Sequence, residues 1–391
     1  MASMMSLVAL SIDAMLPALT TIGQDLQVAD PNDTQLVIAM IFLGMSIGLP
    51  FWGTLSDSMG RKPSVYMGFA LFMVGCGLSY WAPTLTWLLV GRFLQGLGVA
   101  GPRVVVLALV RDQYAGKGMA KIMSFVMMIF ILVPIVAPAF GQLVLAFASW
   151  RDIFLAIMVV GVAVVAWFAI RHPETLPPEE RGPMRWQKVG RALKEIFKSR
   201  VGLGYTVTSG LVMGAFLGFL NSIEPILKRQ YGVGEDFALY FGILAFFIGL
   251  STLLNSRLVD RLGMQRMTQS ATVGIILTAL VFLAVRLFVI DEFPLWLLLV
   301  YLFITLFSVG ILFGNLSSLA MEPLGHIAGT GASVVSALGT IVGLPIGVVI
   351  GQMYDGNAIP MIAGFAIFNI LSLVLMRWIE AGRVEPAPQP V

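Results

Sequence analysis

The sequence predicts an all-α polytopic membrane protein, with 12 transmembrane helices arranged as two six-helix bundles. The composition and the length of the apolar blocks both indicate this class. Of the 391 residues, 58% are hydrophobic and only 12% are charged, and the mean hydropathy is +0.91. A soluble domain carries about 25% charged residues, so this chain has too few charges to cover a water-exposed surface of its size. Its apolar residues form blocks of roughly 20, the helical length that crosses a hydrocarbon core ~30 Å thick.

Twelve apolar blocks follow one another along the chain, and each is long enough for one transmembrane helix. They cover residues 2–22, 34–55, 64–83, 86–110, 121–147, 152–171, 202–227, 237–258, 267–290, 295–320, 328–353 and 359–379. They use about two-thirds of the chain, which leaves no extramembrane domain of useful size. The first block lacks a basic segment and an Ala-x-Ala cleavage site, so we interpret it as a helix and not as a cleaved signal peptide. Because it begins abruptly, we expect that residues are missing ahead of Met1.

The distribution of Lys and Arg predicts the orientation of the helices. Of the 24 basic residues, 18 lie at one end of the predicted helices, four at the other end and two inside the fourth block. Basic loops of membrane proteins face the cytoplasm. We therefore expect both termini to be cytoplasmic, in the inner membrane of a bacterium.

The longest polar segment, residues 171–200, divides the blocks six and six. Its Pro-rich start is typical of a linker, and its second part places Trp186, Val189 and Leu193 on one helical face opposite Lys and Arg. This pattern predicts an amphipathic helix on the cytoplasmic membrane surface, with a solvated connector as the alternative. The expected domains are an N-terminal bundle (1–171), a linker (172–200) and a C-terminal bundle with a short tail (201–391).

The two halves also resemble each other weakly. The segments "GTLSDSMGRKP" and "SRLVDRLGMQR" follow the second and eighth blocks, and "PAFGQL" and "VVIGQM" end the fifth and eleventh. Parallel repeats about an axis along the membrane normal are typical of transporters that rock two bundles around a central site. The halves are therefore expected to show pseudo-two-fold symmetry.

Several classes of chemistry are excluded by composition. The chain has one cysteine and two histidines that lie far apart, so no disulfide, metal site or nucleophilic triad can be assembled. The net charge of +3 and the pI near 9 follow from the basic loops and do not indicate nucleic-acid binding. We expect no enzymatic activity, metal or cofactor.

Residues 53–62, "GTLSDSMGRK", resemble the loop 2–3 motif of the major facilitator superfamily, G-x-L-x-D-R-x-G-R-[RK], with Ser58 as the one departure. The resemblance extends over essentially the whole chain and implies that superfamily's fold. The residues expected to form the gating motif are Gly53, Asp57, Gly60, Arg61 and Asp112. Gly60 permits the tight turn, and Arg61 can reach acidic groups at the end of the fourth helix and latch the cytoplasmic side in the outward-facing state. The alternative is that these charges are only topology signals.

Two further motifs narrow the resemblance. "GRFLQGLG" (91–98) resembles the helix-four motif of proton-coupled members, and "PIVAPAFGQ" (134–142) resembles the helix-five motif of antiporters. In the second motif Pro134, Pro138 and Gly141 match, while Ala137 and Gln142 stand where glycines are usual. Together with "SIDAMLPAL" in the first block, these motifs are similar to the Bcr/CflA group of drug:H+ antiporters. That group exports compounds such as bicyclomycin and chloramphenicol-type antibiotics.

Asp13 is the only charged residue of the apolar run "LVALSIDAMLPAL". At 1.5 Å per residue, Asp13 and Arg92 of the fourth block both lie roughly 12–14 Å below the outer surface. Charged residues at that depth normally pair or face a cavity. We predict that Asp13 accepts the proton, with Arg92 as its partner, and that Asp13 also contacts substrate. A static buried pair that orients helices is the alternative.

Other polar residues in apolar surroundings are candidates for substrate contacts. Arg103 falls on the same helical face as Arg92, and either contacts a polar substrate group or snorkels toward the cytoplasm. Asn221 and Asn315 either contact substrate or form interhelical hydrogen bonds. Glu224, near the outer end of the seventh block, is expected at a wet rim more than in an outer gate.

These features predict a proton-driven exporter of small amphipathic compounds that works by alternating access. A proton-coupled importer of a small nutrient or metabolite is the alternative with the same fold. The expected partners are a small-molecule drug or metabolite, protons and membrane lipid, with no nucleic acid, and the protein is expected to be a monomer.

Overall fold

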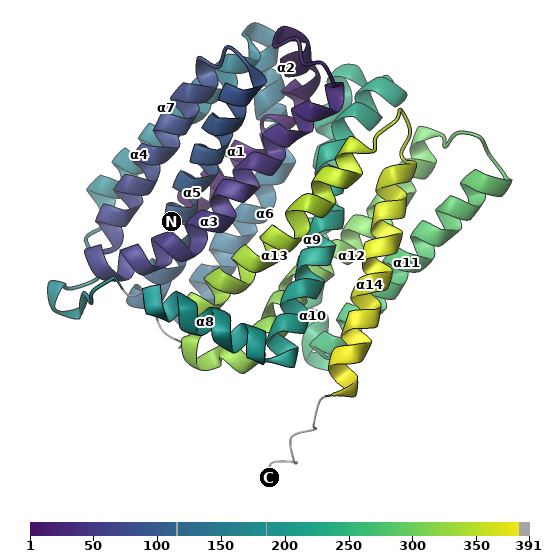
Figure 1. Cartoon of the computed structure of the whole chain (residues 1–391). Helices are drawn as coiled ribbons and strands as arrows, with labels where there is room; N and C mark the ends of the chain where they lie inside the picture. Colours follow the sequence, from purple (N-terminus) through teal and green to yellow (C-terminus); the bar gives the residue numbers. More distant parts are fainter. Residues whose placement is uncertain (115, 185, 383–391) are drawn as a thin grey trace.

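The structure is a computed structural model whose described residues form a bundle of long, closely packed helices (Figure 1). It describes residues 1–114, 116–184 and 186–382, without the side chains at 116, 117, 120, 121, 124, 127, 130 and 131. Four basic residues used to predict the orientation therefore lie outside the described side chains: Lys117, Lys121, Arg185 and Arg383.

The helices before the linker form the first bundle. They are α1 (Ala2–Asp13), α2 (Leu19–Asp25), α3 (Leu36–Met59), α4 (Arg61–Tyr80), α5 (Leu85–Gln113), α6 (Gly116–Phe147) and α7 (Trp150–Arg171), with short 3-10 turns η1 (Leu16–Ala18) and η2 (Pro31–Gln35). A linker helix, α8 (Trp186–Lys198), follows after the turn η3 (Pro178–Glu180).

The second bundle contains the remaining helices. They are α9 (Arg200–Pro225), α10 (Phe237–Leu262), α11 (Met264–Phe288), α12 (Leu295–Met321), α13 (Ala328–Gln352) and α14 (Ile359–Ala381), with the π-helical turn η4 (Ile226–Gln230) and the 3-10 turns η5 (Gly234–Asp236) and η6 (Glu322–Ile327).

The described residues contain ten segments long and apolar enough to cross a membrane. One of them, Leu295–Gln352, contains both α12 and α13, and the shorter apolar stretch Leu132–Phe147 belongs to α6. Each of the twelve apolar blocks thus corresponds to one helix or one broken helix. The expected all-α polytopic fold is confirmed.

The first transmembrane segment is broken, although a continuous helix was expected over residues 2–22. Helix α1 ends at Asp13, and η1 and α2 follow. The cause is Pro17, which has no N–H to donate to the carbonyl of Asp13 four residues earlier and whose ring crowds that carbonyl. The break therefore falls directly after the one acidic residue of the segment.

Helix α6 packs against this break. It contacts both α1 and η1, and Gly141 lies at the closest approach. A Cβ at this position would lie 2.9 Å from the carbonyl carbon of Ala14 and 3.2 Å from Cγ of Pro17, closer than such atoms tolerate. The glycine of the helix-five motif is thus required by the packing of α6 on the broken segment.

The two bundles meet along two lines of helices. Helix α3 packs on α13, and α6 packs on α10. Figure 1 shows the purple-to-blue helices of the first bundle on one side and the green-to-yellow helices of the second on the other. We call the end that holds the α3–α4 turn, α8 and η6 the basic end, and the end that holds η2, η4 and η5 the opposite end.

Helix α8 lies across the basic end (Figure 1). Ala192 and Ile196 are buried, and the helix packs on α13, α9 and α3. Its Trp186 ring lies 6.0 Å from that of Phe51 in α3. The predicted amphipathic helix is present, and protein covers only part of its apolar face, because Trp186 stays exposed. The domain bounds at residues 171 and 200 stay a prediction.

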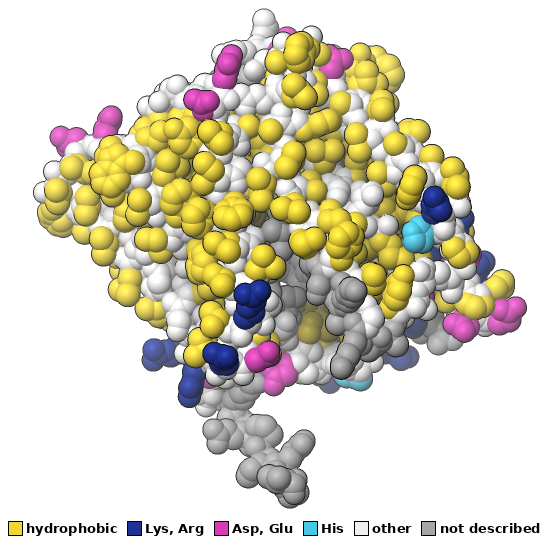
Figure 2. Space-filling view, turned by 180° about the vertical axis from the view of Figure 1, so that it is seen from behind, with side chains coloured by type: hydrophobic (Ala, Val, Ile, Leu, Met, Phe, Trp, Pro, Cys, Tyr) yellow, Lys and Arg dark blue, Asp and Glu magenta, His cyan; other side chains and the backbone are white. Residues whose placement is uncertain are grey.

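The surface matches a protein surrounded by lipid. Apolar side chains cover the middle of the face seen in Figure 2, and Lys and Arg gather mainly toward its lower part. Exposed examples on the membrane-spanning helices include Val159, Trp167, Leu280 and Val374. A multi-pass membrane protein needs such an apolar belt.

We predict that Gly141→Ala destabilises the protein, because the added methyl group overlaps the broken segment and overpacking typically costs about 1–3 kcal/mol. The matched control is Gly118→Ala in the same helix, where a Cβ meets nothing within 4 Å. The midpoint of thermal unfolding in detergent should fall for Gly141→Ala and stay level or rise for Gly118→Ala. Equal midpoints for the two variants would show that α6 does not need the close approach.

Candidate functional site

Asp13 lies at the end of α1, in the middle of the first bundle. Its side chain is buried, with 6% of the residue exposed. Among the described residues it has no hydrogen bond and no ion pair within 4.0 Å. A carboxyl group in this position can exchange a proton without first breaking such a contact.

Arg92 is fully buried in α5 and connects several helices. Its Nη1 donates to the carbonyl oxygen of Ser11 in α1 at 2.8 Å and to Oε1 of Gln95 at 2.7 Å. Its Nε donates to the carbonyl oxygen of Val37 in α3 at 3.1 Å. Gln95 in turn donates to Oγ of Ser79 in α4 at 3.1 Å. Arg92 therefore ties α1, α3 and α4 to α5.

The predicted contact between Asp13 and Arg92 is indirect in this structure. No ion pair within 4.0 Å joins them among the described side chains, but the two charges are close enough to attract each other. The Nε and Nη1 atoms of the guanidinium bind the carbonyl groups of Val37 and Ser11 instead. Its Nη2 is buried without a hydrogen-bond partner in the described part of the chain. The two N–H groups of Nη2 thus remain available to a carboxylate that moves toward them.

Arg103 lies on α5 between Arg92 and the basic end, and it is half-buried. Its Nη1 lies 3.1 Å from Sδ of Met45 in α3. No carboxylate among the described residues pairs with it. The guanidinium therefore has most of its hydrogen-bonding capacity unused.

The two candidate asparagines differ in how fully their amide groups are hydrogen-bonded. Asn221 is buried in α9 and donates to the carbonyl oxygen of Gly347 in α13 at 3.0 Å, while its Oδ1 has no partner among the described residues. Asn315 in α12 forms two amide hydrogen bonds with Asn255 of α10, at 2.9 and 3.0 Å. For Asn315 the structure shows interhelical bonding, and its contact with substrate stays a prediction.

The gating-motif residues are gathered at the basic end. Gly60 has φ +105°, a conformation that favours glycine and makes the turn between α3 and α4. Nη1 of Arg61 donates to Asp57 at 2.7 Å, and its Nε donates to Asp112 at the end of α5 at 2.9 Å. Gly53 lies on α3 beside α5 and α13. These charges form one network within the first bundle, so they do not themselves bridge the two bundles here.

Glu174 completes this network, and the sequence analysis missed it. Its carboxylate accepts hydrogen bonds from the backbone N–H groups of Arg61 and Lys62, at 2.9 and 3.0 Å. These are the first two residues of α4, whose N-cap, Gly60, has no side chain to do this. Partial burial raises the pKa of Glu174, but the backbone N–H groups of Leu176, Arg61, Lys62 and Thr175 lower it, and the net pKa is below its usual range. The signal in the sequence is an acid directly after the sixth membrane span.

At the opposite end, a replaced motif residue joins the two bundles. Gln142 of α6 accepts a hydrogen bond from the N–H of Ala238 in the first turn of α10, at 3.2 Å. Its amide also donates to the carbonyl oxygen of Glu235. Glutamine at this glycine position of the motif thus caps a helix of the other bundle.

Further hydrogen bonds join the bundles at the same end. Nζ of Lys228 donates to the carbonyl oxygen of Pro17 at 2.6 Å. Asn32 of η2 donates to the carbonyl oxygen of Tyr354 at 2.9 Å, and Gln352 donates back to the carbonyl oxygen of Asn32 at 3.2 Å. The opposite end is therefore held together by contacts from three pairs of helices.

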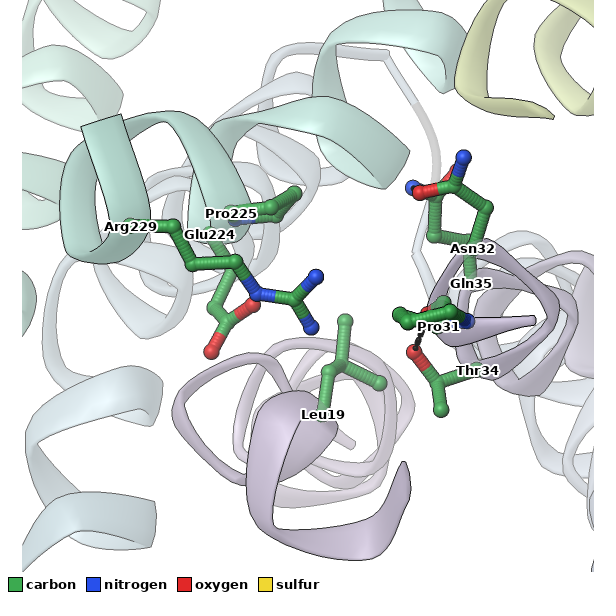
Figure 3. Close-up of a pocket in the computed structure, with 8 residues that line it drawn as sticks. All are labelled: Leu19, Pro31, Asn32, Thr34, Gln35, Glu224, Pro225 and Arg229. Atoms are coloured by element: carbon green, nitrogen blue, oxygen red, sulfur yellow. Dashed lines mark hydrogen bonds between the residues drawn. The ribbon is translucent and has the colours of Figure 1, made fainter. Parts of the chain in front are cut away.

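Glu224 also lies at this interface, which corrects the expectation of a wet rim residue. Only 1% of it is exposed, because α2 of the first bundle packs on α9, and residues of η2 line the small pocket beside it. Figure 3 shows Glu224 and Arg229 on one side of a small pocket, across from Leu19, Pro31, Asn32, Thr34 and Gln35.

Comparisons with known proteins agree with this architecture. The sequence profile of the Major Facilitator Superfamily matches residues 1–348. An uncharacterized MFS-type transporter, YdgK of Bacillus subtilis (strain 168), is 31% identical over 359 residues, which are 90% of this chain and 87% of the relative. A bicyclomycin resistance protein homolog of Haemophilus influenzae is 27% identical, covering 93% and 90%. The multidrug resistance protein MdtL of Escherichia fergusonii is 28% identical, covering 97% and 94%.

Solved structures show the same fold. The Escherichia coli xylose transporter XylE, in a partially occluded inward-open conformation, has a TM-score of 0.74 at 12% identity, with 100% of this chain and 98% of that chain covered. The human organic anion transporter MFSD10 has a TM-score of 0.70 at 17% identity, with 97% of each chain covered. Likeness at these identities shows the fold alone. The family match and the named relatives confirm the resemblance to the Bcr/CflA group: the chain belongs to the major facilitator superfamily and is a membrane transporter, not an enzyme.

Proposed function

We propose that this transporter exports small amphipathic compounds, of the chloramphenicol and bicyclomycin type, in exchange for protons. The membrane is the inner membrane of a bacterium, with the basic end and both termini in the cytoplasm. The opposite end is then the outer end. The proton gradient is the energy source, and no cofactor takes part.

The observation that carries this proposal is the buried carboxyl group of Asp13, which has no hydrogen bond among the described residues and lies near the buried guanidinium of Arg92. A charge in the membrane interior is costly unless it is paired, so binding a proton changes the stability of any arrangement that buries Asp13. Movement of α1 relative to α5 would bring the carboxylate to the unused Nη2 of Arg92. The proton and the substrate would then bias the same two-state rotation of the bundles.

The guanidinium of Arg103 favours a substrate that carries an electron-rich polar group. A guanidinium in the membrane interior without a carboxylate partner normally contacts substrate, water or backbone carbonyls. Its five N–H donors suit a nitro, carbonyl or carboxylate oxygen. This favours neutral or zwitterionic drugs over purely cationic ones.

The gating motif is proposed to act as one rigid unit. Arg61 binds acids from α3 and α5, and Glu174 attaches the start of the linker to α4. The linker begins at this network, and α8, which follows in the chain, packs on α13. Rotation of the second bundle can therefore act on the loop through the linker.

We predict that Asp13→Asn abolishes proton-driven transport, because an amide cannot carry the proton. In proteoliposomes with an acidic lumen, the wild type should take up chloramphenicol or bicyclomycin as protons leave, and Asp13→Asn should not. Exchange of labelled for unlabelled drug without a gradient should persist in the variant. The control is Asp291→Asn, which removes a fully exposed carboxylate.

The same assay separates export from import. A symporter would take up its substrate when the outside is acidic, which is the reverse gradient. Full gradient-driven uptake by Asp13→Asn would show that the proton binds elsewhere. Uptake only with an acidic exterior would reverse the proposed direction.

We predict that Glu174→Ala lowers the midpoint of thermal unfolding at pH 7, because loss of a helix cap costs about 0.5–2 kcal/mol. The pKa of Glu174 is lowered in the folded protein, so its stabilisation is present above the ordinary pKa of about 4.3 and is lost as the pH falls through the lowered value. The difference from the wild type should therefore shrink in acid. The control is Glu179→Ala, an exposed acid on the same linker, and a similar effect of the two variants would exclude the capping role.

A further inference from the structure

Glu224 is a buried acid that the proposed coupling at Asp13 does not use. It is the second-last residue of α9, just before η4 begins, at the outer end of the second bundle. It is almost completely buried, and its Oε1 has no hydrogen-bond partner among the described residues. Its nearest charged group is Nζ of Lys228, at 3.6 Å.

The other groups around it can be named element by element. On its own segment, Lys228 and Arg229 carry positive charge. From α2, Thr20 is in contact with the carboxyl group, and η2 contributes the uncharged Asn32, Thr34 and Gln35 to the pocket. From the end of α13, the hydroxyl of Tyr354 donates to the carbonyl oxygen of Pro225 at 3.1 Å.

The carboxyl group of Asp33 in η2 does not line this pocket and bonds to a residue of α13 instead. Its Oδ1 accepts a hydrogen bond from Nε2 of Gln352 at 3.3 Å. The only acid lining the pocket of Figure 3 is Glu224, among the side chains the structure describes. Its protonation is therefore governed by two cations of its own segment and by burial.

The ammonium group of Lys228 lies near two oxygen atoms, at different distances. It lies 2.6 Å from the carbonyl oxygen of Pro17 in the first bundle, but 3.6 Å from Glu224. In this closed arrangement it therefore donates a hydrogen bond across the interface and forms only a longer ion pair, at 3.6 Å, with the carboxyl group of Glu224. An ionised Glu224 would attract the ammonium away from Pro17, and a neutral one would leave it there.

Opening the outer end must change the surroundings of Glu224. The contacts of Lys228 with Pro17 and of Glu224 with Thr20 join the two bundles, so both are lost when the bundles separate. Glu224 then faces water, where an ionised carboxylate is well solvated. Burying it again as a carboxylate, with an ammonium no closer than 3.6 Å, is costly, and a bound proton removes that cost.

Proton binding and closure of the outer end are thus thermodynamically linked, and the linkage is reciprocal. We propose that Glu224 is a second proton-binding site of the transporter: it takes a proton from the outer water when the outer end is open, and this proton favours the closed arrangement in which Lys228 bonds to Pro17. The proton returns to the outer water when this end reopens, so it is not translocated. This inference rests on the proposed function for its place in the cycle.

Its effect has the direction that a proton-driven exporter needs. After drug leaves on the acidic outer side, protonation of Glu224 closes the empty transporter there and returns it toward the cytoplasm. At alkaline external pH the outer end stays open longer. Because the proton on Glu224 is not translocated, the number of protons exchanged per drug molecule is set by Asp13 alone.

The test measures the distance between spin labels attached through Gln24→Cys and Trp296→Cys, two exposed positions at the outer ends of the first and second bundles, in lipid nanodiscs and with Cys76→Ala. All proteins carry Asp13→Asn, which removes the proton site at the centre. Between pH 8 and pH 5 the ratio of closed to open molecules should rise about 5-fold to 150-fold, the usual range of coupling between linked sites. With Glu224→Gln the outer end should be closed at both pH values.

Matched variants make the result decisive. Two variants should keep the pH response: Glu292→Gln, which removes an exposed acid of the outer α11–α12 loop, and Glu224→Asp.

Lys228→Met should reduce the closed fraction at both pH values. It tests the contact with Pro17 if Glu224→Gln does not fold. An unchanged pH response in Glu224→Gln would overturn the proposal, as would an end that is open at every pH, which is the behaviour of a purely structural ion pair. These distances need no substrate, so failure of drug transport in the wild type would count against the proposed function alone.

Discussion

The need to satisfy a guanidinium inside the membrane organises the first bundle. Arg92 is fully buried, so its N–H groups donate to backbone carbonyls of α1 and α3 and to the side chain of Gln95. The carbonyl it takes from α1 belongs to Ser11, two residues before Asp13. The depth of the carboxyl group is therefore set by the arginine through the backbone, without an ion pair between the two side chains. A substitution that merely removed charge at Arg92 would also release the helices that it holds.

Pro17 connects the region around Arg92 with the opposite end of the molecule. Because Pro17 has no N–H, α1 stops at Asp13, and α6 can approach the break only through Gly141. The carbonyl oxygen of the same proline accepts the hydrogen bond of Lys228 from the second bundle. The break thus places the central acid and the outer contact between the bundles within one short segment.

The number of helices and the gathering of the motif could be predicted from the sequence, because helix length and local turn chemistry depend on neighbouring residues. Arg61, Asp57 and Asp112 came together as expected. The break after Asp13 was missed although Pro17 was visible, since an apolar run does not show where its backbone bonds are lost. The roles of Glu174 and Gln142 and the burial of Glu224 could not be predicted, because each depends on partners about 100 residues or more away in the chain or on the other bundle. Periodicity carries no information about such partners.

The two ends of the molecule are held in different ways, and this difference bears on how it moves. At the basic end the charges of the motif bind one another within the first bundle and its linker, so they can rotate as a unit. At the opposite end a few hydrogen bonds cross between bundles, from Lys228, Gln142 and Asn32. Each such bond contributes about 0.5–1.5 kcal/mol net, so together they amount to a few kcal/mol. That is comparable to the 1–3 kcal/mol by which one bound ligand typically shifts another equilibrium. The closed opposite end is therefore stable enough to be populated and weak enough for the binding of one ligand to shift the balance between its closed and open arrangements.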